Sequence, residues 1–496
     1  MQGKKEFKQK IYYDFSLESL VPQDHLLKRI DKLVTFEFVR DRTKGYYSNT
    51  GKPSIDPVVL VKMLLIGYLF DIRSERKLVE EISLNLAYRW YIGYDLDEAI
   101  PDHSIFSKAR ARFGKKLFCQ IFEEILKIAA SFNLVCKDTL FIDSTIVKAN
   151  ASIDSIVEVN LSPDEYWREL DENEKRQSRQ GAKPKEALSQ QIGSHFSGSP
   201  DKRKIGKRRR ARNAAYLKKR STTDPDATMF YRPGQGGTLS YKANITTEAN
   251  GFITAISASP SSLHDTSAVP ELIEMHENVL GTPSWVAADT KYGSEECLAY
   301  LQDKGIKTVI LPEVKNNRPG YFAKDKFSYD AQNDNYICPN KKILKRKTKS
   351  YTLNRVTYSA KKQDCLSCSL RSLCIKPAID SPRKVTHYDS NYYSKAREWY
   401  YSCHGRHLQK LRRVVIEGVI GNAKAYHRLN RAKLRGRQKV QIQFLLTASA
   451  LNLKKMVKIL EINGLKQSFL RTISGVYQFF KNIFIKRLNI PVFLKA

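Results

Sequence analysis

Apolar residues recur at helical spacing through the first 135 residues of the chain. The pattern predicts helices over residues 56–70, 74–92 and 102–113, separated by the polar or proline-containing segments GKPSIDP and DLDEAIPD. Asp102 is placed to cap the third helix, which would expose Arg110 and Arg112. Short helices with tight turns, one of them basic, favour a helix-turn-helix-like DNA-binding domain over an ordinary helical bundle with a solvated basic face.

From residue 139 the pattern changes to short β-type runs. The run TLFI ends at Ile142 and is followed directly by Asp143, and the run WVAA ends at Ala288 and is followed directly by Asp289. A hairpin is expected over 238–259, turning at 248–251, and helices over 264–278 and 292–304 lead to a last strand at 308–311. The order of three strands, helix, strand, helix, strand predicts an α/β layer sandwich with an acid at the ends of the first and fourth strands.

A later helical stretch, residues 412–424, reads RRVVIEGVIGNAK. Positions 413, 417, 421, 424 and 428 share one stripe of a helix, with apolar residues at 414, 415, 419 and 420 behind it. The stripe therefore carries one acid, Glu417, among the cations Arg413, Lys424 and Arg428. An acid among cations suits a site that holds a metal and a polyanion, and a simple Arg–Glu pair on a helix surface is the alternative.

Charge identifies the class of partner. The 496 residues carry 85 basic and 51 acidic side chains, a net charge of +34, which favours a nucleic-acid partner. The segment 202–220 contains eleven Lys or Arg, including Arg208, Arg209 and Arg210. Such blocks are usually solvated or disordered tails, but its place between two β segments favours a position along a phosphate backbone. No apolar run is long enough to span a bilayer and the N-terminus does not resemble a signal peptide, so we expect a cytoplasmic protein without a membrane partner.

Four of the eight cysteines cluster between the predicted sheet and the Glu417 helix. Their spacing is Cys338-x26-Cys365-x2-Cys368-x5-Cys374. Four thiolates would complete a tetrahedral structural Zn²⁺ site and stabilise an insertion without a core of its own, and reduced free thiols are the alternative. The segment beyond the cluster is expected to form a helix over 440–460, followed by a basic, aromatic tail that could pack, dimerise or touch DNA.

Three carboxylates far apart in sequence are candidate metal ligands: Asp143, Asp289 and Glu417. Two lie at expected strand ends and one on a helix that would pack against the sheet. Hard divalent cations take oxygen ligands, and a pair of them stabilises both the attacking and the leaving oxygen of a phosphodiester displacement. Neighbouring cations such as Arg413 and Lys424 would neutralise the phosphate charge.

At these residues the chain resembles the DDE transposases of bacterial insertion sequences. FIDSTIVKANAS at 141–152 and VAADTKYGS at 286–294 look like the two aspartate motifs, and 412–436 looks like the glutamate motif with its Arg-x3-Glu-x6-Lys spacing. STTDPDA at 221–227, GTLSYKANI at 237–245 and SIDP…SERKLVEEI…AYRWYIG…PDHSIFSKARARFG also look like this group. In related transposases a tyrosine stands three residues before the arginine, and here that position is Lys410.

The resemblance implies an α/β RNase H-like catalytic domain, a mixed sheet flanked by helices, over 136–314 and 393–460. A helical DNA-binding domain (1–135), a basic insertion (153–237), a Cys-containing β-rich insertion (315–392) and a basic tail (461–496) complete the expected organisation. It implies two Mg²⁺ or Mn²⁺ ions on the three acids, with double-stranded DNA as the partner, both terminal inverted repeats and target, and at least a homodimer on that DNA. Lys242 is a candidate DNA contact, with a solvent-facing strand lysine as the alternative. His264 and Asp265 could assist the site, since similar transposases often have an acid after the third strand, but a helix cap at Asp265 is favoured.

Three functions fit these observations. The first is a DDE transposase that cleaves and transfers DNA strands. The second is a DNA-binding regulator derived from a transposase whose catalytic domain is inert, and the third is an RNase H-like nuclease without strand transfer. The presence of all three acids favours an enzyme, and the separate helical domain favours end recognition over simple nuclease action.

Overall fold

The computed structural model covers the chain in nine described segments. These are residues 16–48, 54–158, 219–231, 234, 236–312, 320–350, 355–375, 381–388 and 391–487. No helix of these segments is both long and apolar enough to cross a membrane.

The N-terminal region is helical, as predicted. Its helices are α1 (Leu17–Leu20), α2 (Leu26–Leu33), α3 (Phe38–Thr43), α4 (Pro57–Leu69), α5 (Glu75–Leu84), α6 (Leu86–Ile92) and α7 (Ser104–Ser131), with short 3-10 turns η1 (Lys44–Tyr46) and η2 (Ile153–Ser155) farther along. Two predicted boundaries were wrong. The expected helix over 74–92 breaks at Asn85, which caps α6, and the expected helix over 102–113 continues to Ser131 through a kink at Gly114 (φ +58°). The Asp102 carboxylate does accept a hydrogen bond from the first helical amide, that of Ser104, at 2.8 Å.

The central sheet has six strands. They are β1 (Thr139–Lys148), β4 (Thr228–Phe230), β5 (Thr238–Glu248), β6 (Ile253–Pro260), β7 (Trp285–Ala288) and β8 (Lys307–Val309). β1 and β6 pair antiparallel with β5 on its two sides, whereas β1, β7 and β8 run parallel. The predicted succession of elements is present, but β4, which pairs with β5, was not predicted. The hairpin between β5 and β6 turns where expected, through Gly251 at φ +82°. A separate short pair joins β2 (Ile156–Glu158) to β3 (Lys219–Ser221).

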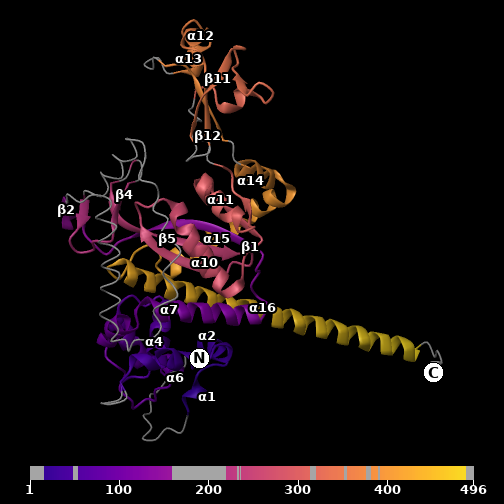
Figure 1. Ribbon diagram of the computed structural model, residues 1–496. Helices are drawn as coiled ribbons and strands as arrows, with labels where there is room; N and C mark the ends of the chain where they lie inside the picture. Colours follow the sequence, from indigo (N-terminus) through magenta and orange to yellow (C-terminus); the bar gives the residue numbers. More distant parts are fainter. Residues whose placement is uncertain are drawn as a thin grey trace, which may run out of the picture.

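Helices cover both faces of this sheet (Figure 1). On one face α10 (Val269–Leu280) and α11 (Glu295–Asp303) pack on alternate residues of β1 and β7, among them Ile142 and Val286. On the other face α15 (Cys403–Tyr426) packs on the remaining residues, Phe141 and Ala287. The 3-10 turns η3 (Asp265–Ala268) and η4 (Thr290–Tyr292) precede α10 and α11, and α14 (Asn391–Tyr401) lies beside β8. Because side chains alternate across a strand, this packing fixes which face each polar residue of β1 and β7 occupies.

Helix α16 (Arg437–Arg487) connects the two halves of the molecule. It packs against β6 and also against α7 and α4, so the N-terminal helices and the sheet share one core. Its first turn is held by the STTDPDA motif, since Asp226 accepts a hydrogen bond from the Arg437 amide and Asp224 accepts one from the Gly436 amide. The predicted helix over 440–460 lies within α16, but the prediction was too short because α16 continues to Arg487. The helix extends away from the remainder of the molecule (Figure 1).

Polar side chains of α16 pair with the free edge of β6. Asn452 accepts a hydrogen bond from the Ile253 amide (2.9 Å) and donates one to the Ile253 carbonyl (2.8 Å). Gln441 accepts one from the Ala258 amide (2.6 Å) and donates one to the Ile256 carbonyl (2.7 Å). The backbone groups of an edge strand need partners when they are buried. The side-chain amides of Asn452 and Gln441 supply these partners in place of another strand.

The insertion between β8 and α14 is β-rich, as expected, and forms a second, smaller sheet. It is antiparallel, in the order β13–β12–β11–β10–β9, with η5 (Lys324–Lys326) before it. Its elements are β9 (Ser328–Asp330), β10 (Asn335–Ile337), β11 (Ile343–Ser350), β12 (Arg355–Ser359), α12 (Lys362–Leu366), α13 (Arg371–Cys374) and β13 (Lys384–Tyr388). Figure 1 shows this insertion beyond α11 and α14, at the opposite end of the molecule from the N-terminal helices.

Candidate functional site

Asp143 lies in the middle of β1, not at a strand end as the sequence predicted. The β-branched residues that follow it continue the strand to Lys148, and Asp143 itself pairs with Ile245 of β5. Its side chain is half-buried and one carboxylate oxygen accepts a hydrogen bond from the Ser144 amide at 2.7 Å. The prediction that β1 ends at this acid was therefore wrong, although the acid is correctly placed in the sheet.

Asp289 directly follows β7, as predicted, and its carboxylate accepts a hydrogen bond from the Thr290 amide at 2.7 Å. β1 and β7 are parallel neighbours in which Ile142 pairs with Ala288. The next residue on each strand is an aspartate, so the register brings Asp143 and Asp289 side by side. Both continue the alternation of Phe141 and Ala287, and both therefore face α15.

Arg412 of α15 contacts Asp143. Its side chain is almost completely buried, and Nη1 lies 3.5 Å from the Asp143 carboxylate. Gln409, one turn earlier, accepts a hydrogen bond from Arg412 Nε (3.2 Å) and donates to the carbonyls of Ala288 (3.1 Å) and Val309 (2.6 Å). The pair ties α15 to the ends of β7 and β8. Sequence reasoning missed both residues, although their i, i+3 spacing on one helix was visible.

Two opposing effects act on the pKa of Asp143. Burial raises it, and the negative charge of Asp289 raises it further. The hydrogen bond from the Ser144 amide and the positive charge of Arg412 lower it. The net direction is upward, which is the usual result for a carboxylate that loses solvent and lies beside another acid. A bound cation at this point would favour the charged form of both aspartates.

Glu417 lies on the same helix with its side chain exposed. The buried stripe of α15 is Leu408, Arg412, Ile416 and Ala423, so the helix is rolled relative to the expected one, and Val414, expected in the core, is exposed. Glu417 makes no ion pair with another described residue. Across the described segments, no three His, Cys, Asp or Glu side chains gather closely enough to hold a metal ion. The structure therefore joins the two aspartates and leaves Glu417 on the flank of α15.

The expected basic stripe on α15 is only partly present. Arg413 and Gly421 are exposed beside Glu417, and Lys424 is half-buried. The prediction for Arg428 was wrong, because α15 ends at Tyr426 and Arg428 adopts a left-handed conformation (φ +56°) beyond it.

Arg428 instead forms an ion pair with Asp71, in the segment between α4 and α5, at 2.5 Å. Asp71 also has a left-handed backbone (φ +57°). The pair borders a cavity of about 490 Å³ that Arg73 and Lys77 also line. Arg428 therefore connects the sheet-bearing half of the molecule to the N-terminal helices.

Two further cations expected to contact DNA are buried in ion pairs. Lys242 lies 2.6 Å from Asp265, which also accepts a hydrogen bond from Ser144, on the face opposite Asp143. Arg110 lies 2.7 Å from Glu75. Neither side chain is presented at the surface, because each has an acidic partner from another element that the sequence pattern could not identify.

Other predictions for polar residues had mixed outcomes. The residue that caps η3 is His264, which accepts a hydrogen bond from the Thr266 amide, so the expected cap at Asp265 was wrong. Arg112 is exposed as predicted and lies over the ring of Tyr47. Arg208, Arg209 and Arg210 lie outside the described residues.

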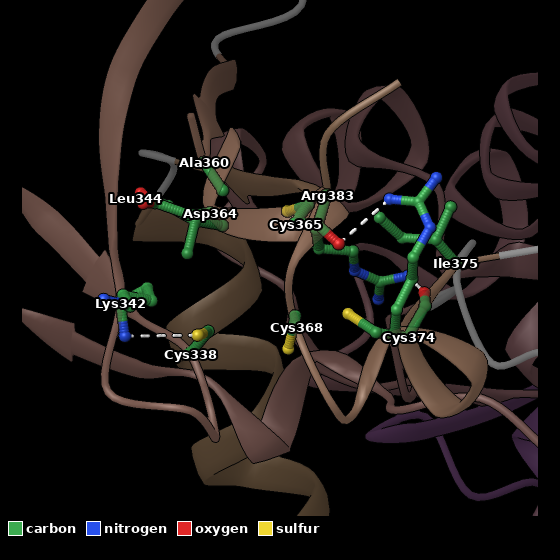
Figure 2. A pocket seen from close by; sticks show the side chains of 11 residues that line it. Cys338, Lys342, Leu344, Ala360, Asp364, Cys365, Cys368, Cys374, Ile375 and Arg383 are labelled. Carbon is green, nitrogen blue, oxygen red and sulfur yellow. Dashed lines mark hydrogen bonds between the residues drawn. The ribbon is translucent and has the colours of Figure 1, made fainter. Parts of the chain in front are cut away.

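The four clustered cysteines line one small cavity in the insertion (Figure 2). All eight cysteines of the chain are free thiols. The cavity is far along the chain from both aspartates and belongs to the second sheet. It is therefore a feature separate from the carboxylate pair.

Comparisons with known proteins identify two regions. A family model described as "Transposase domain (DUF772)" matches residues 15–112, which contain α1 to α6 and the start of α7. A second, described as "Transposase DDE domain", matches residues 337–457, which contain the four cysteines and Glu417. Asp143 and Asp289 lie between the two matches.

No curated protein matches the chain. Among solved structures, the chain is similar to a piggyBac transposase in a cryo-EM synaptic complex with hairpin DNA. The identity is 9%, the TM-score is 0.32, and the alignment covers 95% of this chain and 83% of that one.

Proposed function

Because the two transposase family models identify this chain as an insertion-sequence DDE transposase, we propose that it cleaves DNA at the ends of its own element and joins those ends to target DNA. The proposed ligands of the catalytic metal ions are Asp143, Asp289 and Glu417. The single observation that carries this proposal is the register of β1 and β7, which sets two aspartates side by side on the face that α15 covers.

The strand order supports an RNase H-like catalytic domain. Four strands joined by antiparallel pairing, β1, β4, β5 and β6, are followed by two, β7 and β8, that run parallel to β1, with helices on both faces. In this arrangement the register of the two strands alone brings residues at adjacent positions of β1 and β7 together, independently of the rest of the chain. A helix that arrives from far along the sequence, here α15, can then supply the remaining groups.

The donor set suits hard divalent cations. Carboxylate oxygens are the only ligand atoms that the three acids offer, and such oxygens are the ligands that Mg²⁺ and Mn²⁺ take. When bound, two such ions would activate the attacking oxygen and stabilise the leaving oxygen of the phosphodiester. In this proposal Asp143 and Asp289 would share one ion, and Glu417 would complete the set by approaching from the flank of α15.

Other side chains of the site contribute positive charge. Arg412 lies against Asp143 and favours its charged form, which burial opposes. Arg413 is exposed one turn before Glu417, and the half-buried Lys424 follows on the same side of α15. We propose that both contact phosphate oxygens of bound DNA. These contacts would position the backbone without reading its sequence.

Sequence recognition is assigned to the N-terminal helices. The net charge of +34 supports binding of double-stranded DNA, both terminal repeats and target, and paired ends require at least two copies of the chain. Arg112 on α7 remains a candidate contact because it is exposed. Lys242 and Arg110 are weaker candidates because each side chain is buried and ion-paired with an acid, and Arg428 is ion-paired with Asp71.

The test uses purified full-length protein, Mg²⁺, and DNA that carries the inverted repeats flanking its gene. We expect Asp143→Asn, Asp289→Asn and Glu417→Gln each to abolish cleavage and joining while binding to the repeats is retained in a gel-shift assay. Glu398→Gln is the matched control, because Glu398 is an exposed glutamate on the adjacent helix α14.

The outcomes separate the hypotheses. Normal cleavage by the Glu417→Gln variant would show that Glu417 is not a ligand. Binding without cleavage by the unmodified protein, on ends that are shown to be correct, would instead identify an inert DNA-binding regulator.

A further inference from the structure

We propose that Cys338, Cys365, Cys368 and Cys374 bind one structural Zn²⁺ that holds the β-rich insertion in its fold. The inference is independent of the carboxylate site, because the insertion is a separate sheet with its own small core. It concerns stability and shape, not the chemistry of strand transfer.

The four thiols come from three places in the insertion. Cys338 lies in the turn between β10 and β11, Cys365 lies in α12 and Cys368 just after it, and Cys374 ends α13. All four line one cavity of about 30 Å³, together with apolar side chains such as Leu344 and Ile375 (Figure 2). A volume of this size has room for a single small occupant.

N–H groups around the cavity donate hydrogen bonds to two of the four cysteine sulfurs. The Lys342 amide donates a hydrogen bond to Cys338 Sγ (3.3 Å), and the Asn340 side chain donates one to Cys368 Sγ (3.4 Å). The turn closes on itself through a hydrogen bond from the Cys338 amide to the Lys342 carbonyl (2.9 Å), with Lys341 in a left-handed conformation (φ +55°). Such N–H groups lie outside the proposed coordination shell and hold the two sulfurs in position.

Charged residues in the cavity lining complement a bound ion. A Zn²⁺ with four thiolates carries a net charge of −2, because four negative charges surround a divalent cation. The lining contains three cations, Lys342, Arg371 and Arg383, and one acid, Asp364, a net charge of +2. The lining charge therefore balances that of the occupied site.

The two arginines also hold the cysteine-bearing segments in place. Arg371 donates a hydrogen bond to the Cys365 carbonyl and Arg383 donates one to the Cys374 carbonyl, each at 3.0 Å. The segments that would carry two of the ligands are thus fixed by contacts outside the proposed coordination shell.

The insertion has few other means of stability. Its core contains nine buried residues within the described segments, and one of these is Cys365 itself. A sheet of short strands with so small a core is marginal without a cross-link or a metal. The four thiols line one cavity beside this core, and no disulfide joins them.

The sulfurs do not yet point at one centre, since no three donors in the described chain meet the geometry of a metal site. A cysteine sulfur moves between staggered positions by rotation about a single bond, so the four sulfurs that line the cavity can reorient within it.

The test measures zinc in purified full-length protein by mass spectrometry of the metal. We expect about one Zn²⁺ per chain, as for a closed four-thiolate site. Cys338→Ser and Cys368→Ser should each lose it, whereas Cys403→Ser, an exposed cysteine on α15, should retain it. Asp143→Asn should also retain it, which separates this site from the carboxylate pair.

Hydrogen–deuterium exchange then tests the structural role and guards against general misfolding. Removal of zinc should increase exchange in residues 320–388 while the hairpin of β5 and β6 keeps its protection. Protein purified without zinc but with a protected insertion, or zinc retained after the double substitution of Cys338 and Cys368, would overturn the proposal. Because no DNA is present, a failure here is distinguishable from a failure of the transposase activity.

Discussion

The hydrogen bonds between α16 and the edge of β6 provide a test of how the two halves of the molecule are joined. Asn452 is completely buried and forms hydrogen bonds with both backbone groups of Ile253. In an Asn452→Leu variant the side chain keeps a similar size but forms neither bond. The Ile253 amide and carbonyl would then be buried without partners.

The magnitude follows from these contacts. A buried donor left without a partner costs about 1–3 kcal/mol, and 1.4 kcal/mol corresponds to a factor of ten in an equilibrium constant. Opening of the edge at Ile253 should therefore become roughly 5- to 140-fold more frequent. Amide exchange at that residue reports the opening directly, because exchange proceeds through local unfolding.

The assay is hydrogen–deuterium exchange resolved to single amides, with a reciprocal control in the same strand. Gln441→Met removes the acceptor for the Ala258 amide and leaves Asn452 intact. Asn452→Leu should therefore accelerate amide exchange at Ile253 more than at Ala258. Gln441→Met should accelerate amide exchange at Ala258 more than at Ile253. Unchanged exchange at Ile253 in Asn452→Leu would refute the claim that this side chain satisfies the strand edge.

Two further predictions concern buried charge. His276 on α10 is fully buried, its ring nitrogens have no partner among the described residues, and burial lowers its pKa to about 4. Between pH 6.5 and 4 the unfolded chain therefore binds a proton that the folded chain does not. The free energy of unfolding should fall by up to about 3 kcal/mol as the pH is lowered through this range. In His276→Phe the midpoint of thermal unfolding should depend less on pH in the same range. Asp71→Ala and Arg428→Ala should each destabilise the junction, with a double-mutant coupling of about 0.5–3 kcal/mol in denaturant unfolding, and full additivity would contradict the ion pair.

The sequence identified those parts of the fold that depend on local pattern. The β-hairpin at Gly251, the strand order and the position of Asp289 all follow from alternation and turn residues, which act over a few positions. Asp143 was located in the sheet but not at its place in the strand, because the run from Thr145 to Lys148 was taken as a separate segment. Helix ends were less accurate, as the extension of α16 to Arg487 shows.

The errors in the site share one cause, which is a partner from a distant part of the chain. Lys242 and Arg110 appeared as free cations in the sequence, yet each is neutralised by an acid from another element. Arg412 was overlooked for the converse reason. It adjoins the signature Arg413 in sequence, but a helix turns about 100° per residue, so neighbours point to different sides and only Arg412 reaches Asp143.

The same geometry explains why the third acid is the least determined part of the site. The proximity of Asp143 and Asp289 is fixed by the backbone register of two hydrogen-bonded strands, which cannot shift without moving every side chain to the other face. The position of Glu417 depends instead on the roll of α15 about its axis. Ile416 packs on the sheet, so Glu417 lies about 100° farther round. That roll is held on the sheet side by Gln409 and Arg412, whose contacts are polar and can be exchanged for others. Glu417 is therefore the proposed ligand whose approach to the two aspartates depends on a helix and not on a strand.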